Sequence, residues 1–331
     1  MTVGQPSRED PSSPRDEGRA VAVRRVLTRA LVLLLCAAGS GRAAEPTPDG
    51  RPSAPVTAER RYRLSAAIRP LLFWIGRGNV GGARVVWRAD GDGRRGYELL
   101  LGSDPARAPR RINRWGWTRE DADLSGATMF GVMNRSEDDS LDQAKATLGR
   151  GKDGYFFKMN RARVEQGVAR AEATSLFAPQ DYTFRELADL QRFAESAKPT
   201  PRVREGRLPP GTHPGLLFAL ADLVHAGGAA ARTPGSAGPR PRAVQYTFNA
   251  GLHDLVITSW ERVEKARYGT RTYDRLVRLE FESRNREKGT TERFAFACGT
   301  EGDLAEVPVF VRYQPKWWFK VEGVLDESET L

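Results

Sequence analysis

Four consecutive runs near the C-terminal end alternate apolar and polar side chains with a period of two. In the first run, Val277, Leu279 and Phe281 alternate with charged residues, and three later runs at 294–296, 307–313 and 317–325 repeat the pattern. Because successive side chains of a strand point to opposite faces, each run predicts a strand with one face in a core and the other in water. Turn-forming residues at Gly269 and at 285–289 flank the first run, so we expect an antiparallel meander over residues 243–331.

Short runs of strand-forming residues also fill the segment 61–180. They lie at 62–64, 71–75, 83–87, 97–101, 112–117, 128–133, 155–159 and 164–176. An Asp-Gly-Asp-Gly sequence at 90–93 separates two of the runs and predicts a hairpin turn, because Gly and Asp tolerate positive φ. A calcium loop does not fit there, since Arg94 stands where an oxygen ligand is needed.

Residues 181–242 differ from both β segments and predict a helical insert. Apolar residues three apart indicate a helix over 181–194, and Thr183 with Glu186 fits a capping box at its start. A second helix is expected over 213–225, with Pro214 in its first turn and two glycines at 227–228 ending it. The stretches 198–211 and 227–242 are rich in turn-forming or small residues, so we expect loops there, the second of them mobile.

These elements predict a mainly β fold with a helical insert, in which an antiparallel meander forms a curved sheet, half-barrel or barrel. One or two helices would cover or plug the sheet. We expect residues 61–331 to form one domain, and two separate β domains are the alternative. The outline is similar to that of envelope lipid and lipoprotein carriers, although a fold does not fix a function.

The N-terminal region has the features of an export signal. Arg24, Arg25 and Arg29 precede an apolar run at 30–38, which is shorter than the roughly 20 residues that span a bilayer. A basic flank, a short apolar core and small residues are typical of a signal peptide, so we expect cleavage after Ala43. Residues 1–43 would be an extension plus signal, and residues 44–60 a flexible tether. The paired arginines leave Sec and twin-arginine export both open.

The predicted signal peptide also decides how many cysteines the mature protein has. Cys36 lies in the segment expected to be removed; its lipidation is the alternative, but Leu35 is bulky where a lipobox needs a small residue. The mature protein would then hold one thiol and no internal disulfide. Cys298 alternates with Phe294 and Phe296, which predicts a buried, inert thiol.

The composition and the missing motifs disfavour several classes of function. The net charge is +10, and 44 of the 52 basic residues are Arg, as a GC-rich coding sequence would give; we therefore expect no nucleic-acid partner. The three histidines have no metal-ligand spacing, a GxSxG motif is missing, and residues 149–152 lack a complete phosphate-loop pattern. His253-Asp254 is interpreted as a loop dipeptide that could supply half of an acid–base pair. No metal and no cofactor are predicted.

One segment stands out as a ligand-binding candidate because it combines clustered guanidinium groups with tryptophans. The predicted residues are Arg107, Arg110, Arg111, Arg114, Trp115 and Trp117, together with Trp318 from the C-terminal meander. Arg offers a planar donor fork for phosphate or carboxylate, and Trp suits an amphiphile or a headgroup boundary. The alternative is a loop of solvated Arg that leads into a strand whose tryptophans are core.

Together these features predict an exported envelope protein, periplasmic or extracellular, that binds a lipid, glycolipid or lipoprotein in a β cavity without catalysis. The alternatives are an envelope assembly factor without a ligand and a hydrolase acting on an envelope polymer or ester. Contact with envelope proteins or with a membrane surface is expected to be peripheral, since the mature chain has no apolar run long enough to span a bilayer.

Overall fold

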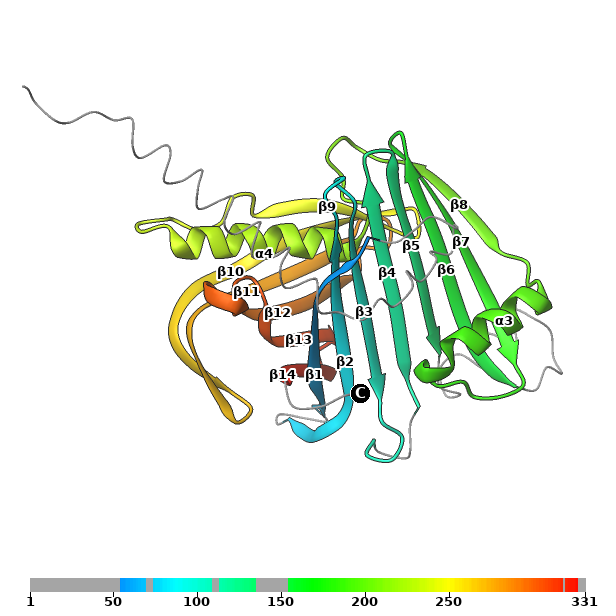
Figure 1. Cartoon of the computed structure of the whole chain (residues 1–331), viewed down its shortest axis with the longest axis horizontal. Helices are drawn as coiled ribbons and strands as arrows, with labels where there is room; N and C mark the ends of the chain where they lie inside the picture. Colours follow the sequence, from blue (N-terminus) through cyan, green and yellow to red (C-terminus); the bar gives the residue numbers. More distant parts are fainter. Residues whose placement is uncertain (1–53, 70–73, 109–112, 135–153, 318, 327–331) are drawn as a thin grey trace, which may run out of the picture. The chain divides into compact units, whose positions relative to one another are not determined.

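The computed structural model describes residues 54–69, 74–108, 113–134, 154–317 and 319–326, and within them the chain forms one 14-stranded sheet and two α-helices (Figure 1). The strands are β1 (Val56–Ile68), β2 (Ile75–Ala89), β3 (Arg95–Ser103), β4 (Trp115–Asp123), β5 (Gly126–Asn134), β6 (Tyr155–Glu165), β7 (Val168–Ala178), β8 (Arg202–Arg207), β9 (Ala243–Phe248), β10 (Gly251–Tyr268), β11 (Arg271–Asn285), β12 (Thr291–Gly299), β13 (Pro308–Lys316) and β14 (Phe319–Asp326). The helices are α3 (Leu187–Ala197) and α4 (Leu216–Arg232), with short 3-10 turns at Phe184–Glu186 and Gly302–Leu304.

The strand order shows how the two predicted β segments join. It runs β8-β7-β6-β5-β4-β3-β2-β1-β14-β13-β12-β11-β10-β9, so the first and last strands of the chain's β region pair at the centre. Tyr62 of β1 lies opposite Leu325 of β14 in that antiparallel pair. The prediction of a mainly antiparallel β fold in one continuous sheet is confirmed. β8 and β9 stand at opposite ends of the strand order, so the sheet is not closed.

The two helices pack on opposite faces of this sheet. Paired residues of neighbouring strands share a face, and following the register from β11 across to β4 places Leu279 and Glu120 on one face and Trp115 on the other. α4 packs on the first face against β9–β12, and α3 packs on the second against β7. Each helix covers an apolar cluster of its own, one around Leu223 and the other around Leu190.

α4 differs from its prediction at both ends. It begins at Leu216, beyond Pro214, and continues through the glycines at 227–228 to Arg232. A Cβ at Gly227 would lie 2.8 Å from both methyl carbons of Leu279, so this glycine permits close packing of the helix on β11 instead of ending the helix. Tertiary contact here outweighs the low helix propensity of glycine.

The predicted helix over 181–194 agrees better with the structure, but the predictions for 198–211 and 164–176 are wrong. A 3-10 turn precedes α3, and the Thr183–Glu186 capping box is present. The segment 198–211, predicted as a loop, contains β8, which pairs with β7. The predicted run 164–176 is split by a turn at Gln166-Gly167, where both residues have positive φ, so it belongs to β6 and β7.

The remaining strand predictions agree with the structure where the residues are described. The hairpin turn at 90–93 joins β2 to β3, and the four C-terminal runs fall in β11–β14. Residues 71–73 of one predicted strand, and the 149–152 motif, lie outside the described residues. Cys298 is fully buried as predicted, and burial raises the pKa of its thiol. In the described part of the chain, no helix is both long and apolar enough to cross a bilayer.

Candidate functional site

Strands β11–β13 present charged and small side chains on the face opposite α4. Arg278 and Glu280 alternate with the buried Leu279 along β11. The register places Glu280 opposite Ala295 and Ala295 opposite Arg312, so these three residues form one row across the strands. Ala295 leaves space between the two charged side chains because it is the smallest member of the row.

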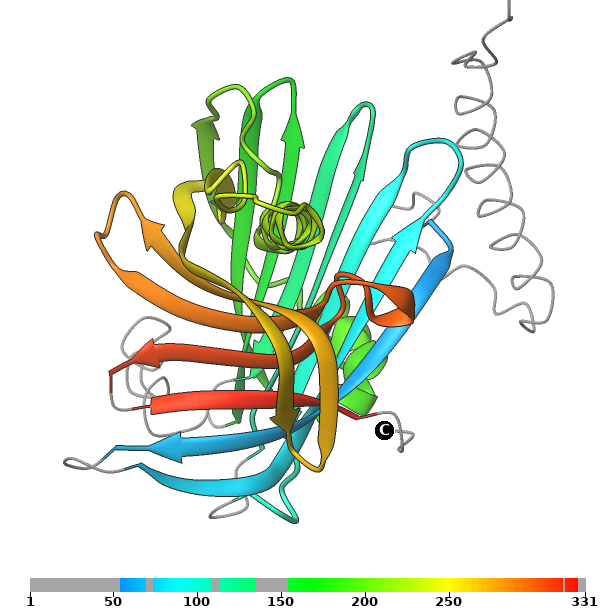
Figure 2. The same ribbon diagram turned by 90° about the vertical axis from the view of Figure 1, so that its left-hand side faces the viewer.

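The end of the β10–β11 hairpin lies over the same face of β13 and β14. The ring of Tyr268 stacks on Phe310 of β13, with centroids 4.7 Å apart and planes 14° apart. At the turn, a Cβ on Gly269 would lie 3.3 Å from Cγ1 of Val324 in β14. A register shift in the middle of β10 adds an unpaired residue, and such bulges bend a strand. Figure 2 shows the hairpin, yellow to orange, curving across the red strands.

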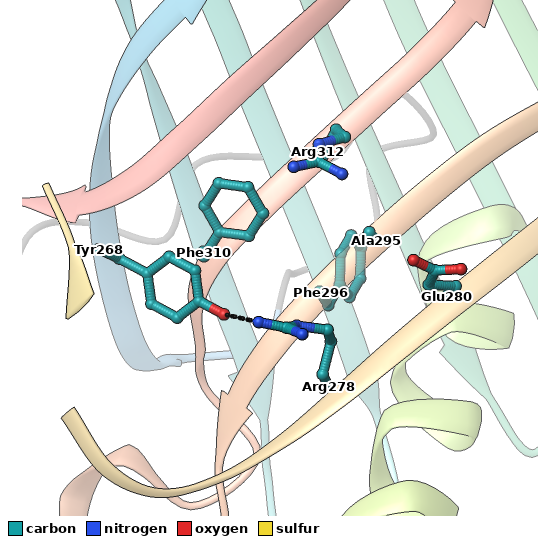
Figure 3. Close-up of a pocket in the computed structure, with 7 residues that line it drawn as sticks. All are labelled: Tyr268, Arg278, Glu280, Ala295, Phe296, Phe310 and Arg312. Carbon is teal, nitrogen blue, oxygen red and sulfur yellow. Dashed lines mark hydrogen bonds between the residues drawn. The ribbon is translucent and has the colours of Figure 1, made fainter. Parts of the chain in front are cut away.

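The curved hairpin and the row beneath it enclose a cleft with a volume of about 240 Å³ (Figure 3). Its lining residues are Tyr268, Arg278, Glu280, Ala295, Phe296, Phe310 and Arg312. Arg278 donates a hydrogen bond from Nη2 to Oη of Tyr268 at 3.3 Å, which raises the pKa of this guanidinium. The guanidinium carbon of Arg312 lies 5.5 Å from the ring centroid of Phe310. Cationic groups and aromatic walls therefore face the same space.

Acidic residues behind the cleft orient its two guanidinium groups. Arg278 is paired with Glu261 of β10. Arg312 donates from Nε to Glu322 of β14 at 2.8 Å, and Lys320 donates to the same carboxylate at 2.9 Å. Burial opposes ionisation of Glu322, but these two donors outweigh it and lower its pKa. The lining itself contains two guanidinium groups and one carboxylate, and Glu261 and Glu322 pair with the two guanidinium groups from outside the lining.

A second polar site lies at the start of α4, on the other face. Glu120 of β4 is buried, and its carboxylate accepts hydrogen bonds from the backbone N–H of Leu217 at 3.0 and 3.1 Å and of Phe218 at 3.2 Å. Gly215 permits this approach, because a Cβ there would lie 2.2 Å from the carboxylate. Burial raises the pKa of Glu120 to about 7 despite these donors. The carboxylate fills the anion site of the helix, so it anchors α4 to β4.

A third polar group joins β9, β10 and β11. The hydroxyls of Tyr246 and Ser283 lie 2.6 Å apart, and Nδ1 of His253 is 3.4 Å from the same tyrosine oxygen. His253 belongs to β10 and stacks on Tyr246, so its predicted place in a loop is wrong. Its sequence neighbour Asp254 binds Arg286 at 2.7 Å instead of the imidazole. Ser283 is 3% exposed, so the group is a satisfied network within the sheet.

The predicted ligand-binding arginines lie on the loop between β3 and β4 or beyond the described residues. Arg107 is exposed, and its Nε is 3.4 Å from Asp104. Arg114 is exposed at the start of β4. Arg110, Arg111 and Trp318 lie outside the described residues. None of the described residues among them lines the cleft.

The two predicted tryptophans of β4 pack under α3. Trp115 is buried, and its Nε1 donates to the carbonyl of Tyr182 at 2.8 Å. Trp117 is half-buried and meets Phe130 edge-on at 5.5 Å. These positions match the alternative that the sequence left open, in which the tryptophans contribute to a core, and the ligand-binding prediction for the segment stays a prediction.

Sequence reasoning missed the cleft residues because they lie on the wet face of predicted strands. Arg278, Glu280 and Arg312 have the alternation expected of solvated positions. The signal that was available is Tyr268 directly before Gly269, an aromatic residue at a hairpin turn. Only the curvature of β10 brings that ring to Phe310, and alternation does not encode curvature.

The comparisons with known proteins show a similarity in structure but none in sequence. No family model matches the sequence, and no curated protein matches it. Among solved structures, the chain is similar to a β-barrel-like protein of the domain of unknown function DUF1849 from Brucella abortus. The TM-score is 0.43 and the identity 9%, over 81% of this chain and 95% of that chain. The description of that structure names neither a ligand nor an activity.

Proposed function

We propose that the protein is exported to the cell envelope and binds a small anionic amphiphile in the cleft between the β10–β11 hairpin and β13, without catalysing a reaction. The observation that carries the proposal is the convergence of Arg278 and Arg312 with the stacked rings of Tyr268 and Phe310 around one cavity. Guanidinium groups recognise carboxylate or phosphate, and the ring faces suit an alkyl chain.

The size of the cleft limits the ligand. Ligand pockets for drug-sized molecules usually occupy about 300–1,000 Å³. A cavity of about 240 Å³ lies just below that range, so it takes a head group and the first part of a chain. The lining contains no Ser, Thr, Cys or His, and a nucleophile beside a base is what a hydrolase needs; this favours binding over hydrolysis.

Export is the second part of the proposal and is supported by the sequence. Residues 24–43 combine paired arginines, a short apolar core and small residues before Ala44. An envelope location would place the cleft where carboxylate and phosphate amphiphiles are abundant. It would also suit a mature protein with one buried thiol and no disulfide.

Native mass spectrometry tests both parts on one sample. The full gene is expressed in a two-membrane bacterium and the protein is recovered gently from the envelope. The expected mass is that of residues 44–331 plus an adduct of lipid size. Because the two guanidinium groups hold the anion, the variant Arg278→Gln/Arg312→Gln should lose the adduct, and its affinity for added dodecanoate should fall about tenfold or more.

The matched control is Arg202→Gln/Arg207→Gln, which removes two exposed arginines from β8 and should keep the adduct. The ligand proposal is wrong if the cleft variant keeps the adduct, or if dodecanoate and uncharged dodecanol bind equally well. If the protein from the envelope fraction still contains residues 1–43, the prediction of a cleaved signal peptide is wrong, and the ligand proposal is unaffected.

A further inference from the structure

Two hairpins end side by side at the centre of the sheet. Ile68, the last residue of β1, lies opposite Ile75 of β2 on one side and opposite Phe319 of β14 on the other. Neighbouring strands are about 4.8 Å apart, so the described ends of β1 and β14, at Ile68 and Phe319, lie next to each other. Trp74 stands at the first turn and Trp317 at the second.

Large apolar side chains are exposed at these two turns. Trp317 is 67% exposed and Ile75 is 52% exposed. Trp74 is half-buried, with the ammonium of Lys320 4.9 Å from its ring centroid. The first part of β2 pairs only with β1, because pairing with β3 begins at Gly81, so this end of the sheet projects beyond its neighbour.

Cationic residues stand close in the chain to the exposed tryptophan and isoleucine, since Arg77 follows Ile75 by two positions and Lys320 follows Trp317 by three. Arg69 follows β1 and Arg77 lies in the exposed part of β2, and neither has an acidic partner among the residues that the structure describes. Lys320 at 2.9 Å and Arg312 at 2.8 Å both bind Glu322 of β14, so this group of three side chains keeps one net positive charge. We name Arg69, Trp74, Ile75, Arg77, Trp317 and Lys320 the tip surface. It is apolar at its end and positive around it.

We propose that the tip surface docks on an anionic phospholipid membrane. Trp is favoured at the depth of lipid head groups, where its ring is in apolar surroundings and its N–H reaches polar atoms. Arg and Lys beside it are attracted to acidic head groups. Trp74 and Trp317 stand beside the ends of strands in adjacent hairpins, so both can reach one plane, which suits a bilayer surface.

This docking goes beyond ligand binding in the cleft, because it assigns a membrane contact to a separate set of residues. Arg278 and Tyr268 belong to the cleft and not to the tip surface. The two proposals therefore fail independently: the single cleft variant Arg278→Gln, which leaves Arg312 and its pairing with Glu322 in place, should sediment with membranes as the parent does.

Co-sedimentation with protein-free vesicles tests the docking. The form of the protein recovered from the envelope is mixed with phosphatidylcholine vesicles that contain phosphatidylglycerol, and with pure phosphatidylcholine vesicles. Trp317→Ala should lower the partition coefficient about tenfold, from the apolar area lost. Arg77→Glu should lower it about fivefold or more, from the lost attraction to acidic lipid. Vesicles without phosphatidylglycerol should retain much less protein.

The control variants are matched in exposure and chemistry. Leu124→Ala removes a 95% exposed apolar side chain from the β4–β5 turn, and Arg202→Glu reverses an exposed charge on β8; both should sediment as the parent does. Equal sedimentation of the Trp317 and Leu124 variants would overturn the proposal. The proposal would also be overturned if the parent protein sedimented with whole envelope membranes but not with lipid vesicles, because that result would indicate a protein partner.

Discussion

Each face of the sheet buries one glutamate in the first half of the chain, and the two are stabilised in different ways. Glu98 on β3 lies on the face that carries α3, is 3% exposed, and binds Arg84 at 2.6 Å and Arg88 at 3.4 Å. Glu120 on β4 lies on the face that carries α4, is 2% exposed, and binds backbone N–H groups of that helix. One face pairs its buried charge with side chains, and the other pairs it with a helix terminus.

The difference extends to the packing of the helices. α3 is short and has one buried residue, Leu190. α4 has nine buried residues, and Leu223 lies at the centre of a cluster that reaches β9–β12. α4 therefore buries more of its own residues than α3 does, and Glu120 fixes the end of α4, while the α3 face has an apolar cluster that comes mostly from the strands. The α3 face also holds buried ion pairs: Glu98 binds two arginines of β2, and Arg119 is buried and binds Asp121 of its own strand, β4, at 2.6 Å.

The largest expected effect is the loss of a leucine from each helix. Leu223→Ala should lower the free energy of unfolding by about 4 kcal/mol, since the rigid sheet around it cannot fill the cavity. Leu190→Ala should cost about 2–3 kcal/mol, because the short helix α3 can move toward the sheet. Denaturant titration measures both free energies of unfolding, provided that the dependence of the free energy on denaturant concentration is the same in the variants and the parent.

A conservative pair shows whether the cavity causes the difference. Leu223→Met and Leu190→Met keep most of the volume and should each cost less than about 1.5 kcal/mol. Equal losses for the two alanine variants would mean that the two helices contribute alike, which contradicts the comparison of the faces.

The two buried glutamates should respond to pH in opposite directions. Burial raises the pKa of Glu120 from its usual value to about 7, so the folded state holds a proton that the unfolded state has lost. Its contribution is present below about pH 4 and is lost as the pH rises through 7, a change of about 3 kcal/mol. Burial opposes ionisation of Glu98, but Trp117, Arg84 and Arg88 outweigh it and lower the pKa of that carboxyl. Its contribution is present above the unfolded pKa and is lost in acid.

Stability curves from pH 2 to pH 8 for Glu120→Gln and Glu98→Gln check these signs. Glu120→Gln should flatten the fall in stability toward pH 8, and Glu98→Gln should flatten the fall on the acid side. A Glu120 variant with the same curve as the parent would show that the carboxyl titrates at its ordinary pKa, and that the N–H donors of α4 offset its burial.

Much of the second half of the sheet could be predicted because one of its faces is apolar and the other polar. β11 shows the clearest alternation, and the predicted run matches it. β8 was missed because its side chains are nearly all exposed and Val203 is its one apolar residue. The strand is stabilised by pairing with β7, so its sequence shows no alternation of apolar and polar residues. Gly227 was misread because its role depends on Leu279, some 50 residues later in the chain.

The candidate sites were harder to predict for the same physical reason. Clustered Arg and Trp marked the start of β4, but Trp115 is part of a core, and a strand face cannot be assigned from residue type alone. The cleft depends on the contact of Tyr268 with Phe310, which are 42 positions apart and meet through strand curvature. The buried setting of Glu120 depends on α4, whose first residue is 96 positions away.

The smallest expected loss of stability comes from a substitution just before α3, and it should affect that helix alone. The hydroxyl of Thr183 donates to Oε2 of Glu186 at 2.9 Å, and the Thr183 N–H donates to the same oxygen at 2.8 Å. Thr183→Ala should cost about 1 kcal/mol, as for other N-cap residues, whereas Thr183→Ser should retain most of the stability. Native-state hydrogen exchange should show faster exchange in α3 and unchanged exchange in α4, because the two helices pack on opposite faces. Faster exchange in both helices would mean that the two faces are coupled through the sheet, so that α3 and α4 do not open independently.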